Sequence, residues 1–191
     1  MATRSGERKN QILQVLAQML QAPKGEKITT AALAAKLDVS EAALYRHFAS
    51  KAQMYEGLIG FVEETVFGLI NKISAEQESG LKQAHAIAAM LLSFAEKNPG
   101  MTRVLIGDAL VNEDGRLQVR INQLHDRLEA TLKQSLRLAA TQGQIDKDAD
   151  AAAQANLMLA YVIGRWHQYA KSGFKRLPTE LWQKQGPMLL G

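Results

Sequence analysis

The sequence predicts an all-α protein of about nine helices, in which a small three-helix head precedes a larger helical body. Apolar residues recur every three or four positions along most of the 191 residues, which is the period of an amphipathic helix. No segment shows the strict alternation of apolar and polar residues that predicts a half-buried strand. We place the head at residues 1–54 and the body at residues 55–191.

The first two helices of the head are separated by a proline-glycine break. Residues 8–21 carry the first helical pattern, and residues 22–25 (Ala-Pro-Lys-Gly) are expected to stop it. Thr29 and Thr30 are N-cap candidates for a second helix, because a threonine hydroxyl can accept from the first free backbone N–H groups. That helix is predicted to end at Leu37.

A tight turn and a third helix follow. Asp38 stands at the turn, where aspartate tolerates a left-handed backbone better than most residues. Ser40 is the expected N-cap of the third helix, whose Leu44 and Phe48 lie four residues apart and are predicted to face the core. Residues 50–53 (Ser-Lys-Ala-Gln) have the pattern of a capping box that opens a long fourth helix.

The body reads as helical throughout. Its apolar periodicity continues the fourth helix through Ile70 and predicts five more helices, over residues 81–97, 101–111, 114–140, 149–171 and 179–189. The breaks between them coincide with residues 98–100 (Asn-Pro-Gly), 141–143 (Thr-Gln-Gly) and Pro178.

Composition argues against an enzyme. The chain has no cysteine, which excludes thiolate catalysis and cysteine-based zinc sites. Its four histidines are scattered without metal-site spacing, and no phosphate loop or nucleophile elbow occurs. We therefore expect no catalytic residue, no metal and no cofactor. The polar N-terminus and the short apolar runs predict a cytoplasmic protein without a signal peptide or membrane span.

Positive charge is concentrated in the head. Residues 1–54 carry eight Lys or Arg against four Asp or Glu, whereas the remaining residues carry fifteen of each sign. The whole net charge of +4 therefore lies on the head, where a polyanion would bind. Ordinary surface variation could also produce this excess.

The third helix has the side chains that a duplex-reading helix needs, so residues 29–48 are predicted to form a helix-turn-helix motif. Ala42 and Ala43 allow close approach to the bases, and donors around them can reach phosphates. The predicted DNA-binding residues are Thr29, Thr30, Ser40, Glu41, Ala42, Ala43, Tyr45, Arg46, His47 and Lys51. The alternative is a structural helical hairpin with these residues on its surface.

This segment resembles the DNA-binding head of TetR-type regulators. The hallmark Leu-Tyr-x-His-Phe, followed closely by lysine, is present as residues 44–48 and Lys51. The resemblance implies that Tyr45, His47 and Lys51 contact phosphates and that residues 40–43 enter the major groove. It also implies a homodimer, which presents two recognition helices about 34 Å apart to a palindromic site.

A further resemblance extends into the body. VSEAALYRHFASK, EKNPGMTRVLIGDAL and GRLQVRINQL resemble the nucleoid occlusion factors of this family. The resemblance implies a nucleoid-associated protein that binds palindromic chromosomal sites as dimers. It would then antagonise polymerisation of the division GTPase FtsZ and prevent septum formation over the nucleoid. A ligand-gated TetR-type repressor is the alternative, and a helical adaptor that binds only proteins is a third hypothesis.

Two helices of the body are candidates for the dimer interface. The 4-3-4 spacing of the apolar residues from Leu117 to Leu128 fits a short coiled-coil seam, but it fits the core face of one amphipathic helix better. The resemblance implies a four-helix interface that includes residues 152–170. The predicted interface residues are Leu117, Ile121, Leu124, Leu128, Ala155, Leu159, Ile163 and Trp166.

The resemblance also implies a surface for the C-terminal tail of FtsZ. Its residues would be Phe61, Val62, Val66, Leu69, Met90, Ser93, Phe94, Lys97 and Asn98. Leu69 and Lys97 stand where the best-known relatives have arginine, and Ser93 stands where they have glycine. Lysine cannot grip a carboxylate with two parallel hydrogen bonds as arginine does. Several of these residues could instead belong to the core.

Overall fold

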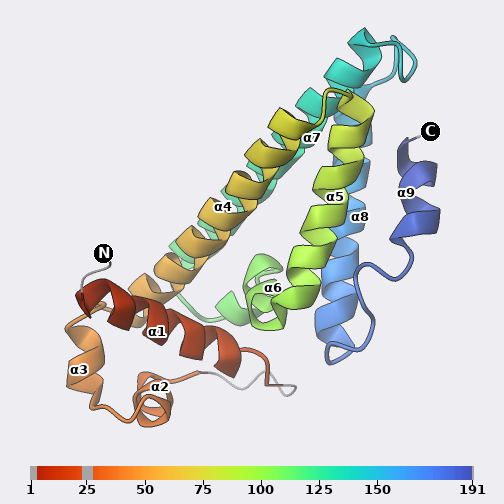
Figure 1. The fold of residues 1–191 in the computed structure, drawn as a ribbon. Coiled ribbons are helices and arrows are strands. Elements are labelled where there is room, and N and C mark those ends of the chain that lie inside the picture. Colours follow the sequence, from red (N-terminus) through yellow and green to blue (C-terminus); the bar gives the residue numbers. More distant parts are fainter. Residues whose placement is uncertain (1–3, 23–27, 191) are drawn as a thin grey trace. The chain divides into compact units, whose positions relative to one another are not determined.

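The computed structural model describes residues 4–22 and 28–190, and in these residues it contains helices and no strand. Figure 1 shows the order of the elements along the chain. They are α1 (Arg4–Met19), α2 (Thr30–Lys36), α3 (Glu41–Tyr45), α4 (Lys51–Glu76), α5 (Gly80–Lys97), α6 (Pro99–Leu105), the short 3-10 helix η1 (Asp108–Leu110), α7 (Gly115–Thr141), α8 (Ala151–Lys171) and α9 (Trp182–Leu190). The predicted all-α fold is confirmed.

The helix ends differ from the predicted ones at several places, of which three have a clear local feature. α1 begins at Arg4, four residues earlier than predicted. α6 ends at Leu105, because Gly107 takes a left-handed backbone with φ 77°, and a 3-10 turn follows. α9 begins at Trp182, since Thr179 is anchored outside the helix by a 2.6 Å hydrogen bond from its hydroxyl to Glu96 Oε2. Of the predicted break at residues 22–25, only Ala22 lies within the described residues.

The chain forms two compact units. The first comprises Met1–Val62 and Pro99–Ile121, and the second comprises Glu63–Asn98 and Asn122–Gly191. The division falls inside α4 and α7 and not at residue 54, where the sequence pattern placed the end of the head. The first unit is larger than the predicted head because α6 packs against α1.

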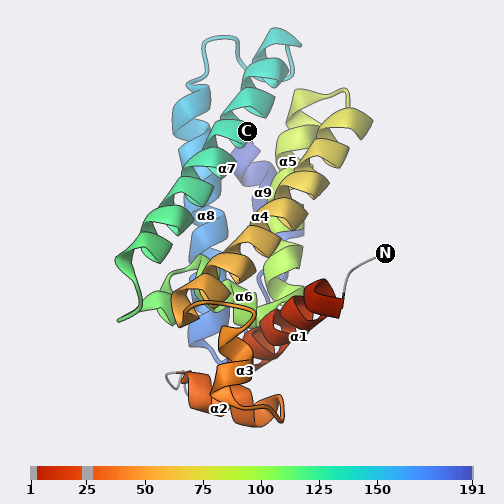
Figure 2. The ribbon, with the colours of Figure 1, turned by 90° about the vertical axis from the view of Figure 1, so that its left-hand side faces the viewer.

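The first unit is built on close packing of α1. α1 contacts α2 and α6, and α2 contacts α3 (Figure 2). Ile12 and Leu16 of α1 are almost fully buried. A side chain at Gly100 of α6 would place its Cβ 2.0 Å from the carbonyl oxygen of Ala17. Only glycine allows the two helices this approach.

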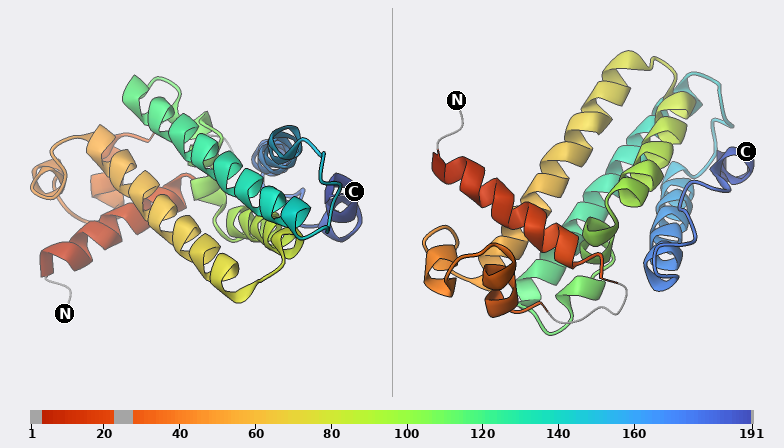
Figure 3. Two further views of the ribbon diagram at one scale, coloured as in Figure 1. Left: turned by 90° about the horizontal axis from the view of Figure 1, so that it is seen from above. Right: turned by 60° about the horizontal axis from the view of Figure 1, so that its bottom comes forward.

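The second unit is organised around α5 and α8. The Trp166 indole of α8 donates to the carbonyl of Leu91 at 3.2 Å, and the Tyr169 hydroxyl donates to the carbonyl of Glu96 at 3.0 Å. These bonds satisfy the polar ends of two buried aromatic side chains, as burial requires. In the left view of Figure 3, α5 (yellow-green), α8 (light blue) and α9 (dark blue) lie next to one another.

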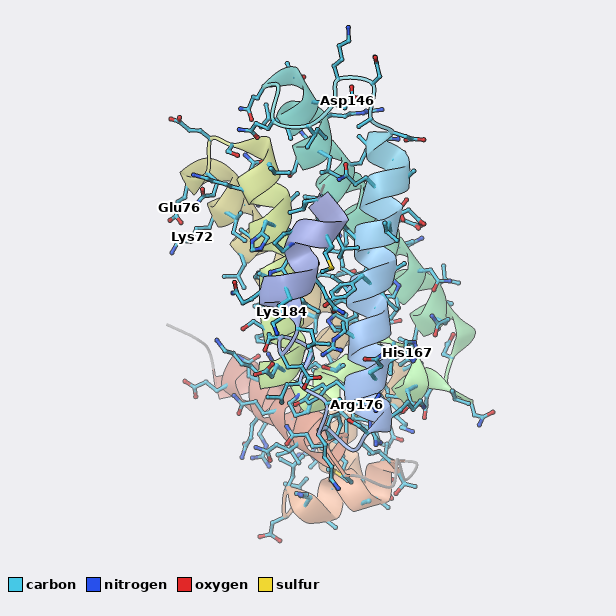
Figure 4. The ribbon with its side chains drawn as sticks, turned by 90° about the vertical axis from the view of Figure 1, so that its right-hand side faces the viewer. Lys72, Glu76, Asp146, His167, Arg176 and Lys184 are labelled. Atoms are coloured by element: carbon cyan, nitrogen blue, oxygen red, sulfur yellow. The ribbon has the colours of Figure 1, made fainter. Side chains whose placement is uncertain are left out.

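α9 runs antiparallel to α8, as Figure 4 shows. The Gln154 amide of α8 donates to the carbonyls of Leu189 and Leu190, both at 3.2 Å. Further along α8, the Tyr161 hydroxyl donates to Gln185 Oε1 at 2.7 Å. Among the described residues, no helix is both long and apolar enough to span a bilayer.

Candidate nucleic-acid interface

The turn between α2 and α3 has the predicted local structure. Thr29 is the N-cap of α2, and its hydroxyl oxygen accepts from the backbone N–H of Ala32 at 3.1 Å. Asp38 has φ 53°, so its backbone is left-handed as the sequence predicted. The turn closes with a 3.0 Å bond from the N–H of Val39 to the carbonyl of Ala34.

α3 begins at the predicted cap and is short. Ser40 accepts from the N–H of Ala43 at 3.2 Å, and the helix ends at Tyr45. Leu44 and Phe48 are buried, which confirms their predicted core position. Ala42 is exposed and Ala43 is half-buried, so the side chains that project from the first turn of the helix here are small methyl groups.

The donors that follow α3 differ in their exposure. The Tyr45 side chain is 45% exposed, and Arg46 is exposed beside it. Both can reach a ligand without a change of fold. His47 is half-buried, and its Nδ1 is buried without a hydrogen-bond partner among the described residues. The structure therefore agrees only in part with the predicted position of His47 on the outer face of the helix.

A hydrogen bond joins α2 to α3 within the motif. The Thr30 hydroxyl donates to Glu41 Oε2 at 2.5 Å. Thr30 is the first residue of α2 and Glu41 the first residue of α3. The bond therefore fixes the Glu41 carboxylate beside the start of the predicted recognition helix.

The start of α4 resembles the predicted capping box but differs by one residue. The N–H of Gln53 donates to Ser50 Oγ at 3.2 Å. The Gln53 amide oxygen accepts from the N–H of Ala49 at 2.9 Å, whereas a capping box would use the N–H of Ser50. Both ends of the reciprocal pair are satisfied, so the helix start is firmly fixed.

Lys51 has an intramolecular partner that the sequence did not indicate. Its ammonium forms an ion pair with Glu113, which follows η1 in the same compact unit. The two side chains are 20% and 11% exposed. Burial, reinforced by the negative charge of Glu113, raises the pKa of the neighbouring Tyr55 hydroxyl above its usual value. The two ion-pair partners are separated by 62 residues, so no local pattern could have revealed the contact.

The predicted FtsZ-tail residues divide between the two units, with Phe61 and Val62 in the first and the others in the second. Phe61 is 48% exposed and Leu69 is 39% exposed. The remaining positions range from fully exposed to buried: Lys97 is exposed, Met90, Ser93 and Asn98 are half-buried, and Val62, Val66 and Phe94 are buried.

The predicted dimer residues lie mostly in the interior of the single chain. Leu117, Ile121, Leu124, Leu128, Ala155, Leu159 and Trp166 are buried, and Ile163 is half-buried. The buried seven offer a second copy no exposed side-chain surface within this chain, and their assignment to a dimer interface stays a prediction. On α7 the apolar spacing marks the inner face of an amphipathic helix and not a coiled-coil seam.

The other faces of α8 and α9 carry exposed apolar residues instead. Leu157 of α8 is 54% exposed and Met188 of α9 is 79% exposed. Ala160 and Gly164 of α8 are also exposed. Ala160 follows Leu157 by three residues and Gly164 follows Ala160 by four, which places the three residues on one helical face. We define these four residues as the outer α8–α9 face.

Comparison of the whole chain with known proteins agrees with this layout. Residues 24–58 match the family of bacterial regulatory proteins of the tetR type, and residues 76–191 match the SlmA-like family of tetracyclin repressor-like C-terminal domains. The chain is 51% identical to the nucleoid occlusion factor SlmA of Idiomarina loihiensis over 185 residues, covering 97% of this chain and 94% of that protein. It is 47% identical to SlmA of Marinomonas sp. over 189 residues, covering 99% and 96%.

Solved structures share the fold at low identity. The fatty acid degradation regulator FadR from Bacillus halodurans matches with a TM-score of 0.80 and 16% identity, covering 99% of this chain and 97% of that one. FadR from Bacillus subtilis, in complex with stearoyl-CoA, matches with 0.76 and 13%, covering 95% and 97%. The predicted fold and the prediction of a non-enzymatic DNA-binding regulator are confirmed. The chain belongs to the SlmA-like family of TetR-type regulators.

Proposed function

We propose that this protein is a nucleoid occlusion factor: it binds palindromic chromosomal DNA as a homodimer and, when bound, antagonises FtsZ polymerisation. The observation that carries the proposal is the extent of the similarity to nucleoid occlusion factors. About half of the residues are identical over nearly the whole chain, and the SlmA-like match covers residues 76–191. A shared function of the body is supported because the similarity is not confined to the DNA-binding head.

DNA binding rests on the exposed side of the helix-turn-helix. Tyr45 and Arg46 are exposed at the end of α3, and Ala42 leaves room at its start for the edges of base pairs. The excess positive charge of residues 1–54 supplies the attraction to phosphates that is independent of sequence. The protein would act in the cytoplasm at the nucleoid.

Dimerisation is assigned to the outer α8–α9 face. Leu157 and Met188 are large exposed apolar side chains, and a second copy that covered them would remove apolar area from water. A Cβ built on Gly164 meets nothing within 4 Å, so a helix of a second copy can approach α8 closely there. Two copies joined in this way are needed to present two recognition helices to a palindrome.

The exposed members of the predicted tail-binding set support contact with FtsZ. Leu69 of α4 offers apolar contact and Lys97 at the end of α5 offers a positive charge, and both residues belong to the second unit. Phe61, in the first unit, is a further exposed apolar side chain. An extended peptide with apolar and acidic residues has the complementary chemistry. The buried members, such as Val66 and Phe94, are not available to contact a peptide in the folded chain.

The test is sedimentation of FtsZ polymers formed with GTP, in the presence of the full-length protein and a duplex containing its site. We expect site-bearing duplex to lower the sedimented fraction and a scrambled duplex to leave it higher. Arg46→Ala should abolish the effect of DNA. Arg176→Ala is the matched control, because Arg176 is an exposed arginine of the second unit (Figure 4).

The same experiment separates the alternatives. For a ligand-gated repressor, the duplex is bound but FtsZ sedimentation stays unchanged at every DNA concentration. For an adaptor that binds only proteins, no salt-dependent duplex binding is seen. Either result would refute the proposed function.

A further inference from the structure

The first turn of α3 contains one carboxylate that is able to read a base. In helix-turn-helix proteins the N-terminal residues of the recognition helix contact base edges. The Ser40 hydroxyl oxygen accepts the capping bond and keeps only its hydrogen to donate, and Ala42 and Ala43 have no polar side-chain atoms. Glu41 Oε2 accepts from Thr30, while Glu41 Oε1 has no hydrogen-bond partner among the described residues. The free acceptor at the start of the helix is therefore Glu41 Oε1.

The position of this carboxylate is fixed before DNA arrives. The 2.5 Å bond from Thr30 spans α2 and α3, and the carboxylate does not have to be ordered when a ligand binds. Phosphates repel a carboxylate on a DNA-binding surface, because both are negative. Glu41 is exposed, and hydrogen-bond donors on base edges inside the groove would offset this repulsion.

The major groove offers such donors on two bases. Cytosine presents its N4 amino group, and adenine presents its N6 amino group beside the N7 acceptor. Guanine presents two acceptors, and thymine presents an acceptor and a methyl group. A carboxylate is repelled by adenine N7, so cytosine is the base that it fits best.

We propose that Glu41 reads one cytosine in each half-site, with Oε1 accepting a hydrogen bond from the N4 amino group. Thr30 acts as a positioning residue, because it holds the carboxylate through Oε2. This assignment rests on the proposed DNA-binding function and adds a base preference to it. The operator is thereby expected to contain a C·G pair opposite the start of α3 in each half.

The experiment selects duplexes from a randomised pool with the full-length protein. We expect the wild type to enrich a palindrome with an invariant C·G pair in each half. Glu41→Ala should make this position alone degenerate, lowering discrimination against other bases by roughly tenfold. Glu41→Gln should shift the preference toward adenine, since an amide can bond both N6 and N7 of adenine.

Two further variants separate reading from charge and from folding. Thr30→Val removes the hydroxyl and should weaken the preference at the same position only. Glu7→Ala removes an exposed carboxylate of α1 and should raise affinity for all duplexes without changing any base preference. Because Glu41→Gln keeps the size of the side chain, a change of preference with this variant cannot come from unfolding.

Two results overturn the assignment. If the Ala and Gln variants of Glu41 enrich the same palindrome as the wild type, Glu41 reads no base, while the proposed function stands. If the wild type enriches no palindrome, both the assignment and the proposed function fail.

Discussion

The ion pair between Lys51 and Glu113 should contribute to stability and compete with DNA. The perturbation is a double-mutant cycle of Lys51→Met and Glu113→Gln, two changes that remove the charges and keep the approximate size of the side chains. Lys51 is the first residue of α4, and Glu113 lies between η1 and α7. Breaking the pair therefore frees a connection between two parts of the first unit that are distant in sequence.

The magnitude follows from the burial of the pair. Exposed ion pairs contribute about 0–1 kcal/mol, and removing one partner of a buried pair costs about 3–5 kcal/mol. At 20% and 11% exposure the two side chains lie between these cases. We expect a coupling of about 1–2 kcal/mol, and each single variant should melt a few degrees lower, since 1 kcal/mol shifts Tm by about 2–4 °C in a protein of this size.

The assay is urea unfolding of the four proteins of the cycle. α4 supplies the control, because Lys72 and Glu76 form a 3.7 Å pair with side chains that are 68% and 60% exposed (Figure 4). The same cycle on that pair should give a coupling below about 0.5 kcal/mol. Equal couplings for the two pairs would refute the reasoning from burial.

DNA binding gives a second readout of the same variants. Lys51→Met should reduce the slope of log affinity against log salt by about one phosphate contact, roughly 0.9. Glu113→Gln should strengthen binding, because the ammonium no longer has to leave a carboxylate to meet a phosphate. An unchanged salt slope for Lys51→Met removes Lys51 from the interface.

Three other predictions test the second unit and α4. Gly80→Ala places a Cβ 2.3 Å from the backbone nitrogen of Ala139, and chemical denaturation should show a free energy of unfolding lower by about 1–3 kcal/mol. The control is Gly68→Ala, whose Cβ meets nothing within 4 Å; it should raise the free energy of unfolding by up to about 1 kcal/mol. Hydrogen bonds from the backbone N–H groups of Ala153 and then Ala152 hold the pKa of Asp150 below its usual value. Asp150→Ala should therefore lower Tm at pH 7, and calorimetry should show the difference vanish as acid protonates the wild-type carboxylate below pH about 4; a constant difference contradicts this. Leu157→Glu should yield monomers in sedimentation velocity, and Val119→Glu, at similar exposure, should not.

Local features of the head could be predicted because their causes lie within a few residues. The caps at Thr29 and Ser40 each bond an N–H three residues ahead, and the left-handed turn at Asp38 depends on that residue's own side chain. The capping pattern at Ser50 was displaced by one residue, since Gln53 reached the N–H of Ala49. Such a shift depends on the side-chain conformation, which the pattern does not specify.

The exposure of apolar helix faces could not be predicted in the same way. Helical periodicity identifies an apolar face, as with Leu124 and Leu128, but it does not say whether that face is covered by the same chain or by another. The structure buries this face and leaves Leu157 exposed on α8. The predicted FtsZ-tail residues divided into exposed and buried sets for the same reason.

The sequence by itself determined the helices, their caps, the charged head and the membership of the family. Each of these depends on neighbouring residues or on short motifs that can be identified directly in the sequence. Only the tertiary structure decided which side chains are available to act. It paired Lys51 with Glu113 and positioned Glu41 through Thr30. These contacts join segments that only the folded chain brings together, and the free energy of a charge there depends on burial and distance, which the order of residues does not specify.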